Sequence, residues 1–265
     1  MKNIKILAIL SLSILLWSCD KDNDMTKETQ GTVTLNFDNV AGEADLTLAV
    51  DGSTEYPYSN ANDQAFNVRM MGYYISKIKL TGDNLMYEDE AYADTEISKG
   101  YYHVQESVSG SAMIELADVP SGSYSQITFT LGIDGSTVQE GALGGVLNPE
   151  NGAWFWNWNV GYIAFALEGS AEDAGSENKQ IAFHIGGWGD PNNIKEISLD
   201  LPTALVVGDQ TSSMAHIKVD ALKTFTGHMN VDFASTFSVH SPAAGEHIAY
   251  NVADAFYAHH VMNNQ

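Results

Sequence analysis

The sequence predicts a mainly β protein, an antiparallel β-sandwich with one C-terminal helix packed on it. Two observations lead to this prediction. Short alternating or β-branched runs recur from residue 31 onward, and clusters of Gly, Asn, Asp and Ser bound them. Near the C-terminus, by contrast, apolar residues recur with the period of a helix.

The strand-like segments follow one another along residues 31–265. Thr32 to Phe37 alternates strictly between polar and apolar residues, and turn sequences such as Pro120-Ser121-Gly122 separate later segments. No internal repeat or linker divides this stretch, so we expect it to be one β-sandwich domain. The other predicted strands are 73–80, 125–133, 161–167, 180–185, 194–199 and 217–222.

The predicted helix covers about residues 243–258. Ser241 can serve as its N-cap and Pro242 as its first residue. Ile248, Val252 and Phe256 are spaced four residues apart, which places them on one helical face. A helix of this length would place His259 and His260, which follow it, at its C-terminal edge.

The N-terminus has the features of a lipoprotein signal. Lys2 and Lys5 precede an apolar run, residues 6–16, which is shorter than the roughly 20 residues needed to span a bilayer. Leu16-Trp17-Ser18-Cys19 resembles a lipobox, and Cys19 has no possible disulfide partner because the chain contains one cysteine. We therefore expect a signal peptide over 1–18 and lipidation of Cys19.

Residues 19–30 form an acidic, polar tether with nothing to bury. This tract resembles the one that follows the lipidated cysteine in surface-exposed lipoproteins of the Bacteroidetes. We expect the chain to be held at the membrane by a lipid anchor. The expected location is the cell envelope, as an outer-membrane lipoprotein that faces the periplasm or the cell surface.

Composition excludes some classes of partner and activity. The formal net charge of −22 repels phosphate backbones, so we expect no nucleic-acid partner. The sequence contains no nucleophile elbow, phosphate-binding loop or zinc-protease motif, and it gives no reason to pair two carboxylates as acid and base. We therefore expect a protein that is not an enzyme.

Three tryptophans stand at alternating positions in one short segment. In a strand, Trp154, Trp156 and Trp158 would share one face. Three interpretations are open: an aromatic cluster of the core, which composition favours, a platform that stacks on sugar rings, or an indole beside a metal or redox partner.

Eight histidines are available in a domain that has no cysteine. His184 and His216 lie in predicted strands or at their ends, and imidazole suits copper, zinc and nickel. Met214, Met229 and Met262 can add thioether ligands or simply fill gaps in the core. No pair has the close spacing of a zinc finger, so spacing alone does not define a site.

A series of motifs in a fixed order carries a family resemblance. From residue 31 onward the chain resembles the MbnP-like family, exported proteins related to a methanobactin-associated copper protein and to a copper-repressible surface protein of methanotrophs. The matching segments are 31–38, 66–68, 73–78, 119–124, 129–134, 141–143, 147–149, 156–163, 167–169 and 184–187.

The resemblance implies a β-sandwich that binds copper through histidines, with Cu(I) preferred. Carried over by position, His184, His216 and His260 are the candidate ligands. The resemblance also implies that a partner diheme, peroxidase-like enzyme oxidises one tryptophan to kynurenine, and Trp156 and Trp158 are the candidates. One departure concerns the first strand, where relatives carry a histidine and this chain has Asn39, a poor copper ligand.

Two functions follow from these observations. The first is an exported, non-enzymatic copper-binding lipoprotein. The alternative is a glycan-binding or adhesive surface lipoprotein that uses the tryptophan-rich strand. Tryptophans buried beside His184 would favour the metal, whereas an exposed coplanar row would favour the glycan.

Overall fold

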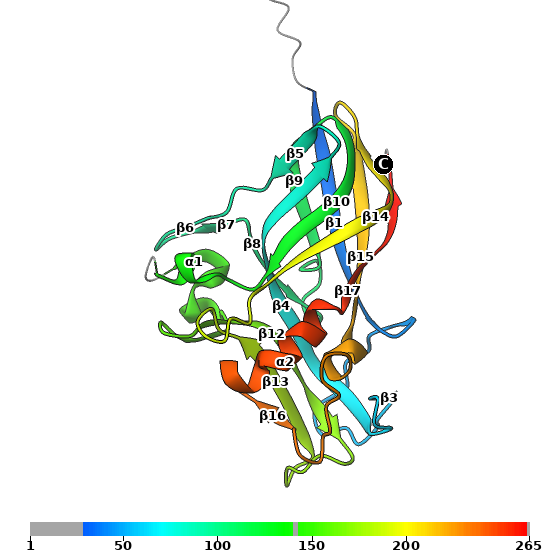
Figure 1. Ribbon diagram of the computed structural model, residues 1–265, viewed down its shortest axis with the longest axis vertical. Coiled ribbons are helices and arrows are strands. Elements are labelled where there is room, and N and C mark those ends of the chain that lie inside the picture. Colours follow the sequence, from blue (N-terminus) through cyan, green and yellow to red (C-terminus); the bar gives the residue numbers. More distant parts are fainter. Residues whose placement is uncertain (1–28, 140–142, 264–265) are drawn as a thin grey trace, which may run out of the picture.

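Two β-sheets form the body of the protein in the computed structural model, which describes residues 29–139 and 143–263 (Figure 1). The predicted β-sandwich class is confirmed. The predicted signal peptide, Cys19 and nearly all of the tether lie outside the described residues. Within the described part, no helix is long and apolar enough to cross a membrane.

The smaller sheet has the strand order β17-β15-β1-β2, and β9 also pairs with β1. Strand β1 alternates between buried and partly exposed residues, as the sequence predicted for this segment. The β1–β15 pair is parallel, which the prediction of an antiparallel sandwich did not include. The bounds are β1 Gln30–Ala41, β2 Ala44–Asp45, β9 Met113–Pro120, β15 Ser212–Asp220 and β17 Phe256–Met262.

The larger sheet has ten strands and is built around the long strand β4. Its main order is β14-β10-β4-β12-β13-β16, with β11 on β12 and with β3, β5 and β8 on β4. The pair β13–β16 is also parallel. The bounds are β3 Tyr58–Ser59, β4 Ala65–Gly82, β5 Leu85–Glu88, β8 Tyr101–Gln105, β10 Gly122–Leu131, β11 Phe155–Asn157, β12 Gly161–Ala171, β13 Gln180–Gly186, β14 Lys195–Val207 and β16 Ser238–Val239.

Short elements connect the sheets. The hairpin β6 Tyr92–Ala93 and β7 Ser98–Lys99 stands apart from both sheets. The helical elements are α1 Gly135–Gln139, α2 Pro242–Ala253 and the 3-10 turns η1 Gly145–Leu147, η2 Pro149–Asn151 and η3 Ala221–Phe225. Because η3 begins at Ala221, β15 ends earlier than the predicted strand and also begins earlier, at Ser212.

The C-terminal helix α2 packs on β13, with Ile248 and Val252 fully buried. Ser241 caps it through a bond from the Ala244 amide, as predicted. The predicted end at residue 258 is wrong, because α2 stops at Ala253 and the chain turns into β17. Phe256 is buried as its spacing suggested, but it lies on a strand opposite Val219.

Two apolar clusters hold these elements in place. The main core lies between the sheets, where Phe37 packs edge-on against Phe129. A smaller cluster gathers Tyr74, Tyr162 and Leu147 under the tryptophan segment. Burial of aromatic rings of this size is the largest single contribution to such cores.

Candidate functional site

Two of the predicted ligands, His216 and His260, meet in the smaller sheet. They occupy paired positions on β15 and β17, and their rings stack with centroids 4.0 Å apart and 14° between planes. Burial, followed by the charge of His260, lowers the pKa of His216 below its usual value. This arrangement keeps the ring neutral, the form in which imidazole binds a metal.

A β-bulge brings His259 to the same pair. The pairing passes from His216–His260 to Ile217–Ala258, so His259 is the extra residue on β17. A bulge redirects a side chain that would otherwise point to the opposite face. The Nδ1 atoms of His259 and His260 therefore lie 2.8 Å apart.

Methionines lie beside these histidines on the same face. Met214 pairs with Met262 two residues along the strands from the histidine pair. Across β1, Asn36 lies between His216 and Met113, so a row of soft donors and polar groups crosses four strands. These side chains lie on the outer face, because the alternate residues of β1, β9 and β15 face the core.

One nitrogen of this group has no partner. The Asn36 amide lies 3.2 Å from Nδ1 of His216, while Nε2 of His216 is buried without a hydrogen bond among the described residues. Because the Asn36 amide donates to Nδ1, the neutral ring of His216 carries its proton on Nε2. A buried N–H without an acceptor costs free energy.

His184, the third predicted ligand, lies in the larger sheet with other partners. Its Nε2 is 2.8 Å from Oε1 of Glu168 on β12, and its Nδ1 is 3.0 Å from Nδ1 of His240. The bond from His184 lowers the pKa of Glu168, and burial followed by the charge of His184 lowers the pKa of His240.

The structure therefore divides the predicted ligand set. His216 and His260 lie together, and His184 does not join them. Across residues 29–139 and 143–263, no group of three or more His, Cys, Asp or Glu side chains is arranged to hold a metal ion. In the smaller sheet, the donors that lie beside His216 and His260 are the sulfur atoms of Met214 and Met262.

Asn39, the residue that departs from the family pattern, has a structural role. It is buried, its amide donates to Oε2 of Glu106, and the Tyr73 hydroxyl donates to its Oδ1 at 2.9 Å. Burial raises the pKa of Glu106, although the bond from Asn39 opposes that shift. The carboxamide thus links β1 to the core, and its oxygen is already occupied.

The tryptophan segment does not form the predicted row. Only Phe155–Asn157 is a strand, and Trp158 lies in the turn that follows. Trp158 is 47% exposed and packs edge-on against Phe155, whereas Trp154 is partly buried against His103. Trp158 therefore does not continue the predicted strand. Trp154 and Trp156 are partly buried, so the three rings do not form an exposed row.

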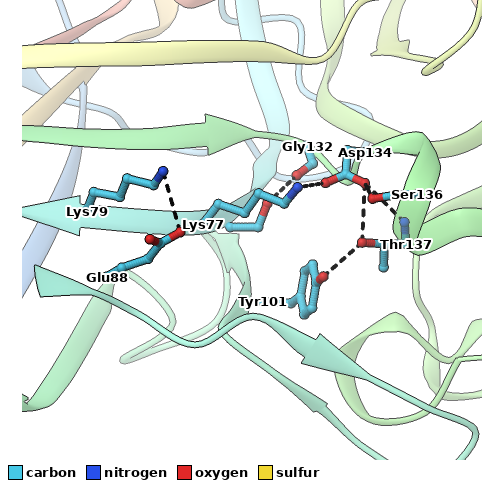
Figure 2. A network of polar contacts seen from close by, with 9 residues as sticks. Lys77, Lys79, Glu88, Tyr101, Gly132, Asp134, Ser136 and Thr137 are labelled. Atoms are coloured by element: carbon cyan, nitrogen blue, oxygen red, sulfur yellow. Dashed lines mark hydrogen bonds and ion pairs between the residues drawn. The ribbon is translucent and has the colours of Figure 1, made fainter.

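A polar network joins β4 to the start of α1 (Figure 2). Lys77 occupies a bulge of β4 with φ of +53° and forms an ion pair with Asp134. The Asp134 carboxylate also accepts a hydrogen bond from the Thr137 amide and thereby caps α1. Burial raises the pKa of Asp134, but the bonds from Lys77, Ser136 and Thr137 outweigh it and bring the value to about 2.

Sequence reasoning missed three contributors to these clusters: His240, His259 and Met113. His240 had no feature that distinguished it from the other histidines of the sequence. Its flanking residues did not indicate a strand beside β13. The alternation of β9 from Met113 to Leu116 was a usable signal, since buried Ile114 and Leu116 place Met113 outside.

A two-sheet β domain with histidines and methionines gathered on strand faces defines a β-sandwich protein that offers donors for a soft metal. The chain belongs to the MbnP family, whose sequence model matches residues 30–242. The chain is also similar to a solved structure titled MbnP from Methylosinus trichosporium. That similarity has 14% identity and a TM-score of 0.49, and covers 77% of this chain and 80% of the other. No curated protein matches.

Proposed function

We propose that this protein is an exported, non-enzymatic lipoprotein that binds copper as Cu(I) on the outer face of its smaller sheet. The observation that carries the proposal is the stacked pair His216–His260 with Met214 and Met262 paired beside it. Membership of the MbnP family supports copper as the metal.

The donor chemistry favours Cu(I) over other ions. Thioether sulfur is a soft ligand that selects Cu(I), and neutral imidazole also binds copper. In this proposal the stacked rings of His216 and His260 supply the nitrogen donors, and Met214 and Met262 supply the sulfur donors. In this proposal the oxygen ligands preferred by calcium or magnesium are not part of the set.

The location and the partner belong to the same proposal. A lipid on Cys19 would hold the domain at the outer membrane, where an acidic protein attracts cationic metal species. A diheme, peroxidase-like enzyme would act on a tryptophan of this chain. Of the two candidates, the exposed Trp158 offers the larger target.

The test is a Cu(I) competition titration with a chromophoric chelator under reducing conditions. We expect about one copper per chain and at least a tenfold loss of affinity in His260→Ala. His247→Ala is the matched control, because His247 is an exposed histidine on α2. Equal affinities for His260→Ala and the unmodified chain would remove the smaller sheet as the copper site.

A further inference from the structure

The chain contains a single arginine, and it lies at a β-bulge of the larger sheet. Glu168 pairs with Met70 and Gly169 pairs with Val68, so Arg69 is the extra residue on β4. A bulge redirects the side chain of its extra residue. Here the side chain of Arg69 lines a surface cavity of about 380 Å³.

Three segments form the walls of this cavity. The loop 51–56 supplies three hydroxyl groups, β12 supplies Ser170, and the segment 178–180 supplies two carboxamides and Lys179. Its volume lies within the range of about 300–1,000 Å³ that small-molecule sites occupy. The cavity is therefore large enough for a small ligand.

A buried amide holds the walls in position. Asn67 is fully buried, and its amide donates to the carbonyl oxygen of Glu55 at 2.9 Å and to that of Ser53 at 3.4 Å. Its Oδ1 accepts from the backbone amide of Ser170 at 2.9 Å, and Ser170 pairs with Gln180. A site that is held in this way loses less conformational entropy when a ligand binds.

The guanidinium of Arg69 has donors beyond those used in its ion pair. Of its five N–H donors, the ion pair with Asp51 uses Nη1 at a distance of 2.7 Å. Nε is buried without a hydrogen bond among the described residues. The Asp51 side chain is 92% exposed, so this ion pair is weak and a ligand carboxylate can displace it.

The charge around the cavity differs from the charge of the whole protein. Arg69 and Lys179 outnumber Asp51 in the lining, whereas the chain carries a formal charge of −22. The bond from His184 is the largest cause that lowers the pKa of Glu168, and Arg69 adds to that shift from nearby. The Glu168 carboxylate is thus already engaged by His184 at 2.8 Å, and the cavity can attract an anion.

We propose that this cavity binds an acidic saccharide through a uronic-acid residue whose carboxylate pairs with Arg69. The planar fork of a guanidinium matches a carboxylate with two parallel hydrogen bonds. The hydroxyl and carboxamide groups of the lining donate and accept, which suits the hydroxyl groups of a sugar ring. Tyr56 adds a partly exposed aromatic ring. None of the described lining residues is a tryptophan, so this surface is separate from the tryptophan segment.

The experiment is a titration of the purified protein with trigalacturonic acid, followed by calorimetry and by ¹H–¹⁵N spectra. Because the chain has one arginine, Nε–H of Arg69 gives the single arginine Nε signal, and we expect that signal to shift on binding. Arg69→Gln should weaken binding about tenfold. Arg69→Lys should weaken it as well, because lysine keeps the charge but loses the planar fork.

Lys223→Gln is the control for the loss of one positive charge, since Lys223 is exposed on η3 and does not line the cavity. Thermal unfolding of each variant checks that the fold is retained. Maltotriose has sugar hydroxyl groups without a carboxylate, and acetate has a carboxylate without a sugar. Both should bind more weakly than trigalacturonic acid.

Four results would overturn the site: no binding of trigalacturonic acid, binding without a shift at Arg69, equal affinity in Arg69→Gln, or equal binding of maltotriose or acetate. None of them depends on whether copper binds the smaller sheet.

Discussion

His103 lies nearly face to face with Tyr74, with ring centroids 4.2 Å apart and 22° between planes. The ring of Trp154 packs edge-on against the same imidazole, with centroids 4.4 Å apart. Nε2 of His103 is buried without a hydrogen bond among the described residues. The imidazole therefore serves as an aromatic spacer between β4, β8 and the tryptophan segment.

This burial makes stability depend on pH. Burial lowers the pKa of His103 to about 4, whereas an unfolded histidine titrates near 6.5. Above about pH 6.5 the ring is neutral in both states. Between about pH 6.5 and 4 only the unfolded chain takes up the proton, so the free energy of unfolding falls as pH falls. His103→Phe should remove about one proton of this dependence in urea titrations at several pH values. An unchanged slope would assign it to other groups.

Asp134 should determine how strongly the free energy of unfolding falls at acidic pH. Its pKa of about 2 lies below the unfolded value near 3.9, so its contribution is complete above about pH 4 and is lost toward pH 2. Asp134→Asn should reduce the free energy of unfolding at pH 7 by about 1–2 kcal/mol. It should also weaken the decrease of that free energy between about pH 4 and pH 2. Asp209→Asn, an exposed turn residue, is the control for a simple change in net charge.

Replacing a single sulfur tests the role of methionine. Met214→Leu keeps the volume and the apolar character, so the fold should be preserved. We expect Cu(I) affinity to fall about tenfold, which corresponds to about 1.4 kcal/mol. Met229→Leu, which changes a methionine packed against the main core, should leave the affinity unchanged. Equal effects of the two substitutions would argue against thioether coordination.

Exposure distinguishes the two tryptophan candidates. Trp158 is 47% exposed in its turn, while Trp156 lies within β11 and is partly buried. The proposed partner enzyme would reach the exposed ring more readily than the partly buried one. Peptide mass spectrometry of protein from the native host should place a kynurenine at Trp158, and Trp158→Phe should abolish its absorbance. A modification mapped to Trp156 would reverse the assignment.

Phe256 should be essential for the last strand. Its ring packs against Phe37, Tyr73 and Phe129 with centroids 6.4, 5.3 and 5.6 Å away. Phe256→Ala should reduce the free energy of unfolding by about 3–5 kcal/mol, measured by urea denaturation. Tyr257→Ala, on the exposed side of the same strand, should cost much less. Similar losses would show that Phe256 is not a core anchor.

The sequence predicted those elements that depend on residues close together in the chain. The strand at residues 73–80 and the cap at Ser241 were both found, because alternation and capping depend on neighbours in sequence. The spacing of Ile248, Val252 and Phe256 did not reveal the end of α2. Phe256 satisfies either a helix or a strand, and its pairing with Val219 decides between them.

The candidate sites were harder to predict because their contacts are distant in sequence. His184 and His240 are 56 residues apart, and Asn36 and His216 are 180 apart. The partner of His184 follows a strand of two residues, which leaves no periodic signal. The bulge at His259 depends on the register of β15 and β17, and that register arises from the whole sheet.

The parallel pairing of β1 with β15 also governs when the domain can fold. A ribosome makes β1 first, but its partner β15 begins at Ser212, and β17 follows only at Phe256. Until then one edge of β1 has no neighbour, and an unpaired strand edge invites association with other chains. Synthesis or transport of nearly the whole polypeptide must precede closure of the smaller sheet. A chaperone that binds the nascent chain would have to cover β1 until β15 is available.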